Sequence, residues 1–177
     1  MNKSNQNEDI IIEPLSKKTI NGALKVLDKV FGNNLKDKVI YHNAFIGSLD
    51  MNKYKLIYGK KEKPSYLQYY VARDKESGRI FGTTGLYVNS ELDTGRIGIG
   101  WFCVDPKFRG KGIGKALLDF TIEKARERRS PVLFLWTTSD PAERLAHKMY
   151  ARRGFRVIKR EKSPRDKYEV ISMELKL

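Results

Sequence analysis

Four segments of the chain carry apolar residues at every third or fourth position, the spacing that places side chains on one face of an α-helix. They cover residues 16–31, 35–49, 112–129 and 140–153. Ser16 is the predicted N-cap of the first segment, and Gly32 and Gly154 are predicted to end the first and the last. After Gly114 the third segment contains no glycine or proline, so its helix is the clearest in the chain.

The remaining apolar residues form short runs rich in β-branched and aromatic side chains, which predict β-strands. These runs are residues 10–12, 66–73, 79–88, 96–104, 132–136, 155–160 and 168–177. The second and third form a predicted hairpin, because the turn-rich residues 74–78 separate them. Val132–Trp136 is apolar throughout, which predicts a strand buried on both faces.

The predicted order of elements is therefore βααβββαβαββ. The helix over residues 112–129 can cross between two parallel strands, whereas the hairpins are antiparallel. An α/β (α+β) fold follows, with one central mixed, mostly antiparallel sheet flanked by helices on both faces. We expect a single domain over residues 1–177, in which the polar residues 1–9 form a disordered tail.

The composition is that of a folded protein and excludes several classes of function. With 177 residues, of which 40% are hydrophobic, the chain can bury one core. No apolar run reaches the roughly 20 residues of a membrane span, and the N-terminus lacks a signal-peptide core, so we expect a cytoplasmic protein without membrane contact. Cys103 is the only cysteine, and His42 and His147 are the only histidines, so we expect neither an internal disulfide nor a metal site.

The net charge of +14 is concentrated toward the C-terminus. From residue 109 onward the chain has 18 Lys and Arg residues against 9 Asp and Glu. This excess favours an anionic partner, which could be a nucleic acid, an acidic membrane surface or a small polyphosphate. Charge alone does not choose among the three.

The segment from residue 109 to residue 115 lies between a predicted strand and a predicted helix and suits a phosphate group. It combines three basic residues with three glycines: Arg109, Lys111, Lys115, Gly110, Gly112 and Gly114. The first N–H groups of a helix have no intrahelical acceptor and lie at the positive end of its dipole, and glycine permits a ligand to approach them closely. It is not a P-loop, because Ala116 stands where Ser or Thr is required, and it follows too many hairpin strands for a Rossmann fingerprint. By itself such a loop is better explained as a solvated turn before a helix than as a site.

Two longer matches point to one family. Arg109-Gly-Lys-Gly-Ile-Gly114, preceded by Val104-Asp-Pro106, resembles the R/Q-x-x-G-x-G/A signature of the GNAT superfamily of N-acetyltransferases. Residues 146–155 resemble that family's later A-x-x-x-Y-x-x-x-G-F helix and strand, and residues 82–87 and 100–104 resemble its central strands. The resemblance, which covers residues 66–155, implies a GNAT-like acyl-CoA N-acyltransferase fold with acetyl-CoA as cosubstrate.

The resemblance also implies residue roles. In such enzymes the amine attacks the thioester directly, so the protein aligns the reactants, stabilises an oxyanion and protonates the leaving thiolate. The main chain of Cys103 and Val104 maps onto a strand bulge that faces the thioester carbonyl, and Tyr150 maps onto the catalytic general acid. The implied cofactor-binding residues are Cys103, Val104, Arg109, Gly110, Lys111, Gly112, Ile113, Gly114 and Lys115. A nucleophilic role for the Cys103 side chain is disfavoured, because no histidine is near it in sequence, and we expect a packed core thiol.

Some positions depart from the family pattern or leave a role open. Glu143 stands where the family often has an Asn that contacts the cofactor, and residues 96–99 supply no glutamate where relatives place a base. Glu91 and Asp93 are candidates for a water-mediated base, although the role of turn residues suits them better. Trp101 and Phe102 are candidates for the acceptor pocket, and we expect at least one of them to fill the core.

We therefore predict an N-acetyltransferase that passes the acetyl group of acetyl-CoA to a primary amine of a small molecule, by direct attack in a ternary complex. One alternative acceptor is a protein or peptide. Another alternative is a non-catalytic basic nucleic-acid-binding module on the same fold, in which residues 126–129 and 152–153 would meet phosphate. Helix dipoles already favour basic residues at these helix ends, so nucleic acid is the less favoured partner. A homodimer stays open.

Overall fold

The computed structural model describes residues 9–32, 35–53, 64–89, 95–163 and 167–177, which form one mixed sheet with helices on both faces. The strands are β1 (Ile10–Pro14), β2 (Pro64–Asp74), β3 (Ile80–Asn89), β4 (Ile97–Val104), β5 (Val132–Thr138), β6 (Arg156–Lys162) and β7 (Glu169–Lys176). The helices are α1 (Ile20–Phe31), α2 (Leu35–Leu49), α4 (Ile113–Glu127) and α5 (Arg144–Arg152), with 3-10 turns at Pro106–Phe108 and Pro141–Glu143. The strand order is β1-β2-β3-β4-β5-β7-β6, and only β4 and β5 run parallel to each other.

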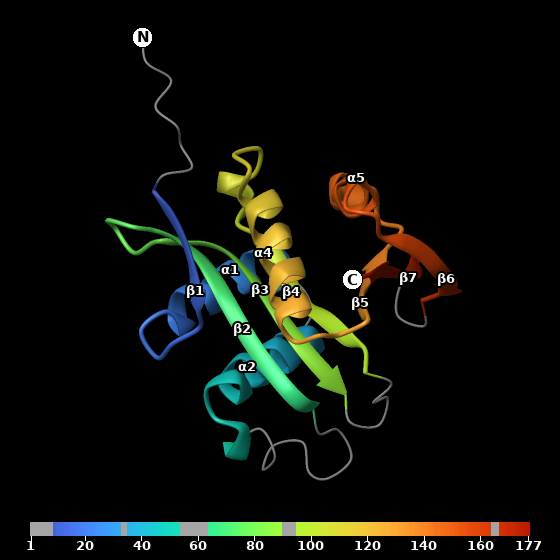
Figure 1. The fold of residues 1–177 in the computed structure, drawn as a ribbon. Coiled ribbons are helices and arrows are strands. Elements are labelled where there is room, and N and C mark those ends of the chain that lie inside the picture. Colours follow the sequence, from blue (N-terminus) through green and yellow to red (C-terminus); the bar gives the residue numbers. More distant parts are fainter. Residues whose placement is uncertain (1–8, 33–34, 54–63, 90–94, 164–166) are drawn as a thin grey trace.

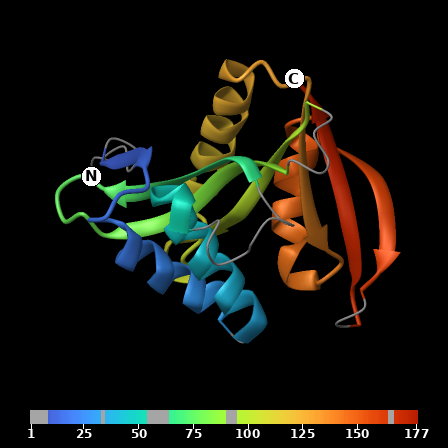
Figure 2. The same ribbon diagram turned by 90° about the horizontal axis from the view of Figure 1, so that it is seen from below.

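Helices cover the two faces of the sheet with separate cores. Helices α1 and α2 pack on one face through a cluster that includes Leu27, Tyr41 and Phe45, all 0% exposed. Helix α4 and Tyr150 of α5 pack on the other face, where Leu118 and Leu133 are also 0% exposed. Figures 1 and 2 show α4 and the α1–α2 pair on opposite sides of the strands. No helix within the described ranges is long and apolar enough to cross a bilayer.

The predicted order of elements and the crossover through α4 are confirmed, but two local predictions are wrong. Thr19, not Ser16, is the N-cap of α1, because Ser16 and Thr19 first close a turn in which the Thr19 hydroxyl accepts from the Ser16 N–H at 2.9 Å. Strand β5 is not buried on both faces, since burial alternates along it and Trp136 is 57% exposed.

The sheet opens between its two parallel strands. Strands β4 and β5 pair at only two positions, Ile97 with Leu133 and Gly98 with Phe134. Beyond Gly98 the strands separate, and α4 and α5 leave from their diverging ends (Figure 1). The edge of β4 from Ile99 to Val104 is therefore not paired with β5.

A bulge in β4 lies at this opening. Strand β3 pairs Gly85 with Gly100 and Thr83 with Cys103, so two residues of β4, Trp101 and Phe102, face the single residue Thr84 of β3. Trp101 has φ 43°, a left-handed conformation that non-glycine residues adopt rarely. The Thr83 hydroxyl donates to the Trp101 carbonyl at 2.8 Å, which supplies a partner where the ladder is interrupted.

Close approach of the strand backbone to an aromatic core predicts a stability effect at Gly85. A Cβ at Gly85 would lie 2.3 Å from the Tyr69 ring, which is 2% exposed and held by stacking on Phe45 at 4.2 Å between centroids. Gly85→Ala should therefore lower the free energy of unfolding by about 1–3 kcal/mol, measured by urea titration. Gly114→Ala is the matched control, because its Cβ would have no neighbour closer than 3.6 Å and should raise helix propensity by up to about 1 kcal/mol. Equal effects of the two substitutions would contradict this account.

Candidate functional site

The loop between β4 and α4 exposes a row of backbone N–H groups. Asp105 caps the 3-10 turn, and Gly110 and Gly112 have φ of 80° and 81°, with Gly112 as the N-cap of α4. The first helical bond runs from the Ala116 N–H to the Gly112 carbonyl. Within the described part of the chain, the N–H groups of residues 110–115 have no hydrogen-bond acceptor. This geometry suits an anion that accepts several bonds at once.

The side chains around these amides are basic and open to solvent, while the helix behind them is anchored in the core. Arg109, Lys111 and Lys115 are all exposed, and the Lys111 ammonium lies 5.6 Å from the centroid of the Phe108 ring. By contrast, Ile113 is 2% exposed, so the start of α4 is fixed. A phosphate group at the loop would meet fixed backbone donors and mobile positive charges. The loop therefore fits the pyrophosphate of a nucleotide cofactor.

One buried ion pair fixes the beginning of this loop. Asp105 is 1% exposed on its side chain, and it accepts from Lys29 Nζ of α1 at 2.6 Å and from the Lys107 N–H at 3.0 Å. Burial alone would raise the pKa of Asp105, but the Lys29 ammonium and the Lys107 amide outweigh it and hold the pKa below its usual value. The loop is thus tied to a helix on the opposite face of the sheet, a contact that sequence reasoning missed.

The open edge of β4 presents main-chain groups to the gap between the strands. The Asp105 N–H donates to Phe81 of β3 at 2.8 Å, so by alternation the N–H and carbonyl of Val104 point away from β3. The Val104 carbonyl accepts from Arg109 Nε at 3.2 Å. The bulge lies at Trp101 and Phe102, and the expectation that Cys103 and Val104 form it is wrong, because both pair regularly with β3. The main chain of Val104 nonetheless faces the opening.

The Cys103 thiol lies in the core and is not prepared for nucleophilic attack. It is 5% exposed and lies 3.4 Å from the Thr83 hydroxyl. Burial raises the pKa of Cys103 to about 11, so the thiolate is scarce at neutral pH. The side chain packs against the α1–α2 face, as a core thiol does.

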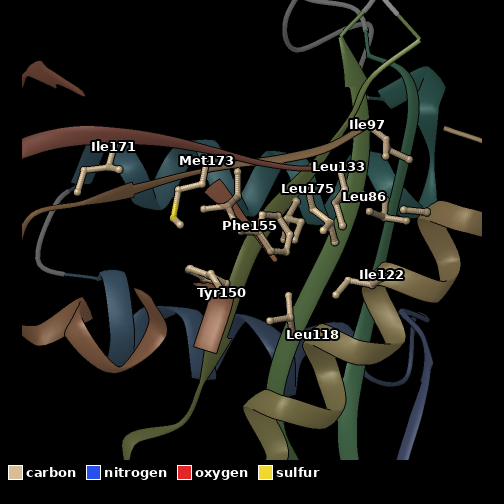
Figure 3. Close-up of a cluster of buried hydrophobic side chains, with 13 residues drawn as sticks. Leu86, Ile97, Leu118, Ile122, Leu133, Tyr150, Phe155, Ile171, Met173 and Leu175 are labelled. Carbon is tan, nitrogen blue, oxygen red and sulfur yellow. The ribbon is translucent and has the colours of Figure 1, made fainter. Parts of the chain in front are cut away.

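Tyr150 lies between α4 and the separated strands. Its ring packs edge-on against Phe102 of β4 at 6.0 Å and tilted against Phe155 at 5.8 Å. Figure 3 shows the ring directed into the same space as Leu118 and Phe155. Tyr150 is 6% exposed, and its hydroxyl has no hydrogen-bond partner among the described residues. Burial raises the pKa of Tyr150, so the phenol stays protonated at neutral pH and could donate a proton.

Glu143, which departs from the family pattern, is engaged with the end of β5. Its carboxylate accepts from the hydroxyl groups of Thr137 and Thr138 and from the Thr138 N–H, the last at 3.0 Å. The Thr137 hydroxyl also lies 3.1 Å from His147 Nε2. These contacts tie α5 to the end of β5, which explains an acidic residue at this position without a cofactor contact.

The base for the acceptor amine is not identified by the geometry. Arg96 forms an ion pair with Glu174, and Ile97 and Ile99 are buried. Glu91 and Asp93 lie outside the described residues, as does most of the lysine-rich connection that begins at residue 53. No group of three or more potential metal ligands of the His, Cys, Asp or Glu type occurs in the described ranges.

Sequence reasoning also missed a polar cluster on α1 and α2. Asp28 accepts from the Tyr41 hydroxyl at 2.5 Å and lies 3.4 Å from both His42 Nε2 and Lys38 Nζ. The Tyr41 ring in turn contacts Trp101 of the bulge at 5.3 Å between centroids. The cluster thus fixes an aromatic side chain against the bulge.

The basic helix ends that could meet nucleic acid are largely paired within the protein. Arg153 donates to both carboxylate oxygens of Asp119 at 2.7 and 2.9 Å, and Arg126 donates to Glu123 at 2.6 Å. The Arg128 guanidinium lies 3.4 Å from the centroid of the Tyr66 ring. These contacts reduce the free positive charge available there.

Two cavities lie away from the open strand edge. One of about 360 Å³ is bordered by Asp119, Arg153 and Leu175, and one of about 260 Å³ lies between α1 and the β2–β3 turn beside Asp105. Neither includes Tyr150 or residues 109–115. The candidate site is therefore defined by backbone geometry and charge and not by the size of a cavity.

Comparison with known proteins identifies relatives of one kind. A profile described as "Acetyltransferase (GNAT) family" matches residues 40–155. A mycothiol acetyltransferase of Propionibacterium freudenreichii subsp. shermanii is 40% identical over 88 residues, which is 50% of this chain but only 27% of that protein. This chain thus matches about a quarter of the relative's length.

Solved structures share the fold at low identity. A protein assigned to the GNAT family from Desulfovibrio desulfuricans superposes with a TM-score of 0.74 and 15% identity, over 94% of this chain and 98% of that one. A chain of the NatC complex, bound to a Gag peptide and CoA, superposes with a TM-score of 0.68 and 20% identity, over 96% and 99%. At these identities the likeness extends to the fold alone.

The Lys29–Asp105 pair makes a testable contribution to stability. Lys29→Met should lower the free energy of unfolding at pH 7 by about 1–3 kcal/mol, because a buried carboxylate loses its cation. The pKa of Asp105 is lower in the folded protein than in the unfolded chain, so the ionised carboxylate stabilises the fold above the unfolded pKa. This stabilisation is lost as the pH falls through the folded pKa. The difference between variant and wild type should therefore begin to shrink below about pH 4 and disappear once the pH has fallen below the folded pKa, as measured by urea titrations.

Lys25→Met on the same helix is the control, since Lys25 is exposed and has no ion pair among the described residues. A pH-independent loss in Lys29→Met, or an equal loss in Lys25→Met, would show that the pair is not the cause.

Proposed function

Because the chain belongs to the acetyltransferase (GNAT) family, we propose that it is an N-acetyltransferase that transfers an acetyl group from acetyl-CoA to a primary amine of a small molecule. The observation that carries the proposal is the row of N–H groups at residues 110–115, which lies beside basic side chains and continues from the open edge of β4. A pyrophosphate joined to an extended arm needs such a combination of a phosphate loop and a free strand edge.

Each part of this site has a distinct role toward the cosubstrate. Acetyl-CoA supplies an activated acetyl thioester when bound. Arg109, Lys111 and Lys115 offset the charge of the pyrophosphate, and the amides of residues 110–115 donate to it. Val104 offers its main-chain N–H at the open edge, where a pantetheine amide could pair as a strand would.

The bulge suits stabilisation of the developing oxyanion. At Trp101 and Phe102 the ladder with β3 is interrupted, and the Trp101 carbonyl is turned to the Thr83 hydroxyl. A backbone N–H of the bulge that does not bond to β3 can donate to the thioester carbonyl oxygen, which gains negative charge in the transition state. The bulge is held by β3 on one side and by Phe31 and Tyr41 through the Trp101 ring, so the donor is fixed before reaction.

Tyr150 completes the reaction as the proton donor. The amine nitrogen bonds to the acetyl carbon, the carbon–sulfur bond breaks, and the electron pair stays on sulfur. Tyr150 gives its phenolic proton to that sulfur and is reprotonated, through solvent, by the proton that the amine nitrogen loses as the amide forms. Its buried ring and its hydroxyl without a protein partner among the described residues favour this role. No described side chain of the site is activated as a nucleophile. The amine therefore attacks the thioester directly, while both substrates are bound in a ternary complex.

Cofactor binding can be tested at two glycines with the same backbone conformation. Gly110→Glu should weaken CoA binding about 10- to 100-fold in calorimetric titration, because a carboxylate would meet the pyrophosphate. Gly95→Glu is the control, since Gly95 also has positive φ (72° against 80°) and room for a Cβ, 3.9 Å from Pro131, but lies at the far end of β4. Failure of the wild type to bind CoA would overturn the proposed function.

The role of Tyr150 predicts a loss of turnover without a loss of affinity. Tyr150→Phe should lower kcat about 10²- to 10⁴-fold, with the Kd of CoA within about twofold of wild type, measured by thiol release and calorimetry. Because the pKa of Tyr150 is raised, wild-type activity should persist above the pH at which an ordinary tyrosine ionises, about pH 10. Tyr70→Phe removes another buried phenol outside the site and should leave kcat unchanged. Unaltered kcat in Tyr150→Phe would remove it from the mechanism.

A further inference from the structure

An aromatic surface lies beside the opening, on the face that α1 and α2 cover in part. Three side chains in mutual contact make up this aromatic surface: Tyr87 of β3, and Phe134 and Trp136 of β5. Trp101 of β4 lies at its border, packed against Phe31 and Tyr41. Ring centroids of Phe134 and Trp136 are 5.3 Å apart, and those of Tyr87 and Phe134 are 5.7 Å apart. Trp136 is 57% exposed, an unusual position for so large an apolar side chain unless it meets a ligand.

Strand register places the two tryptophans on either side of the opening. Gly98 and Phe134 are the last parallel pair before the strands separate, and Trp136 and Gly100, the residue before the bulge, each lie two residues beyond that pair. Leu133, Leu135 and Thr137 are buried on the α4 side, so alternation places Trp136 on the opposite face. The Trp101 ring lies on that face too, against Phe31 and Tyr41 at 5.4 and 5.3 Å. The aromatic surface therefore borders the bulge where the amine must arrive.

Glycines form the floor of this surface. A Cβ at Gly98 would lie 2.5 Å from the Tyr87 ring and 2.8 Å from the Phe134 ring. A Cβ at Gly100 would lie 3.3 Å from the Tyr87 ring and 2.7 Å from the Tyr69 hydroxyl. The Tyr87 and Phe134 rings thus lie close against the backbone of β4, immediately before the bulge. Such an arrangement is built by the sequences of three neighbouring strands, β3, β4 and β5, and is not a chance cluster of exposed side chains.

Charges near the surface disfavour an acceptor with several positive groups. Glu174, the cross-strand neighbour of Phe134, is engaged by Arg96, whose guanidinium lies 5.1 Å from the centroid of the Phe134 ring. Asp28 is engaged by Tyr41, His42 and Lys38. With a net charge of +14, the protein repels polyamines and basic peptides. A single ammonium group is still attracted by the faces of Trp and Tyr rings.

We infer that the acceptor is an arylalkylamine, that is, one primary amine joined by a short alkyl chain to an aromatic ring. The ring stacks on Trp136 and Tyr87, and the amine extends along β4 to the bulge between the two tryptophans. Trp136 is thereby the main determinant of acceptor specificity. This inference rests on the proposed function, because it names the substrate class of the same site.

Steady-state kinetics with matched amines test the inference. The wild type should use phenethylamine with a kcat/KM about tenfold or more above that of butylamine, and spermidine and a short peptide with a free N-terminus should be poorer still. Trp136→Ala should lower kcat/KM for phenethylamine about tenfold, change that for butylamine less than about threefold and leave the Kd of CoA unchanged. Trp136→Phe should restore most of the loss.

Ile158→Ala is the matched control, because Ile158 is 53% exposed on β6, away from the opening, and should alter neither amine. Equal use of phenethylamine and butylamine, a preference for spermidine or the peptide, or an equal effect of Trp136→Ala on both amines would overturn the inference and leave the acetyltransferase intact. A third variant outcome is that Trp136→Ala changes the oligomeric state in size-exclusion chromatography and leaves kcat/KM unchanged. That result would also overturn the inference, because it would assign the aromatic surface to a contact between two copies of the chain. Binding of CoA without acetyl transfer to any amine would overturn both proposals.

Discussion

The separation of β4 and β5 is the constraint on which the rest of the site depends. Two parallel strands that pair at only Gly98 and the residue before it leave several peptide groups of β4 without a strand partner. Buried peptide groups need partners, so such an edge must be solvated or completed by a ligand. The helices that leave the two strands, α4 and α5, keep the strands apart because Leu118 and Tyr150 fill the space between them in one core. The opening is therefore a packed feature of the fold and not a loosened part of it.

Residues on the α1–α2 face of the sheet hold in place the loop and the bulge that border this opening. Lys29 lies on α1, whereas the loop that it steadies through Asp105 leads into α4 on the other face. The bulge is fixed in a similar way, by Thr83 of the neighbouring strand and by the ring of Tyr41, which Asp28 orients. The start of the loop and the bulge are thus both held by residues that lie outside the proposed contacts with the cosubstrate. Such support reduces the reorganisation needed when charge develops.

Much of the fold follows from the sequence, because its periodicities are strong. The apolar stripe after Gly114 predicts α4, and the alternating runs predict the hairpin of β2 and β3. The phosphate loop and Tyr150 were singled out through a family signature, and their roles remain proposals that the mutants above test. Three features could not be predicted from local patterns. The position of the bulge depends on the register with β3, and the exposure of Trp136 depends on where β5 leaves β4. The Lys29–Asp105 pair joins residues that are 76 positions apart in the sequence. Glu143 departs from the family motif, and only its contacts with Thr137 and Thr138 explain why.

The distribution of indole side chains has a practical consequence. The chain contains two tryptophans, and both lie on the same face beside the opening, one packed between Phe31 and Tyr41 and one open to water. Fluorescence excited at wavelengths that tryptophan absorbs and tyrosine hardly does therefore comes from this region alone. Trp101 is partly buried and Trp136 is mostly exposed, so the two emit at different wavelengths. Tryptophan fluorescence of the unlabelled protein therefore reports binding at the strand opening.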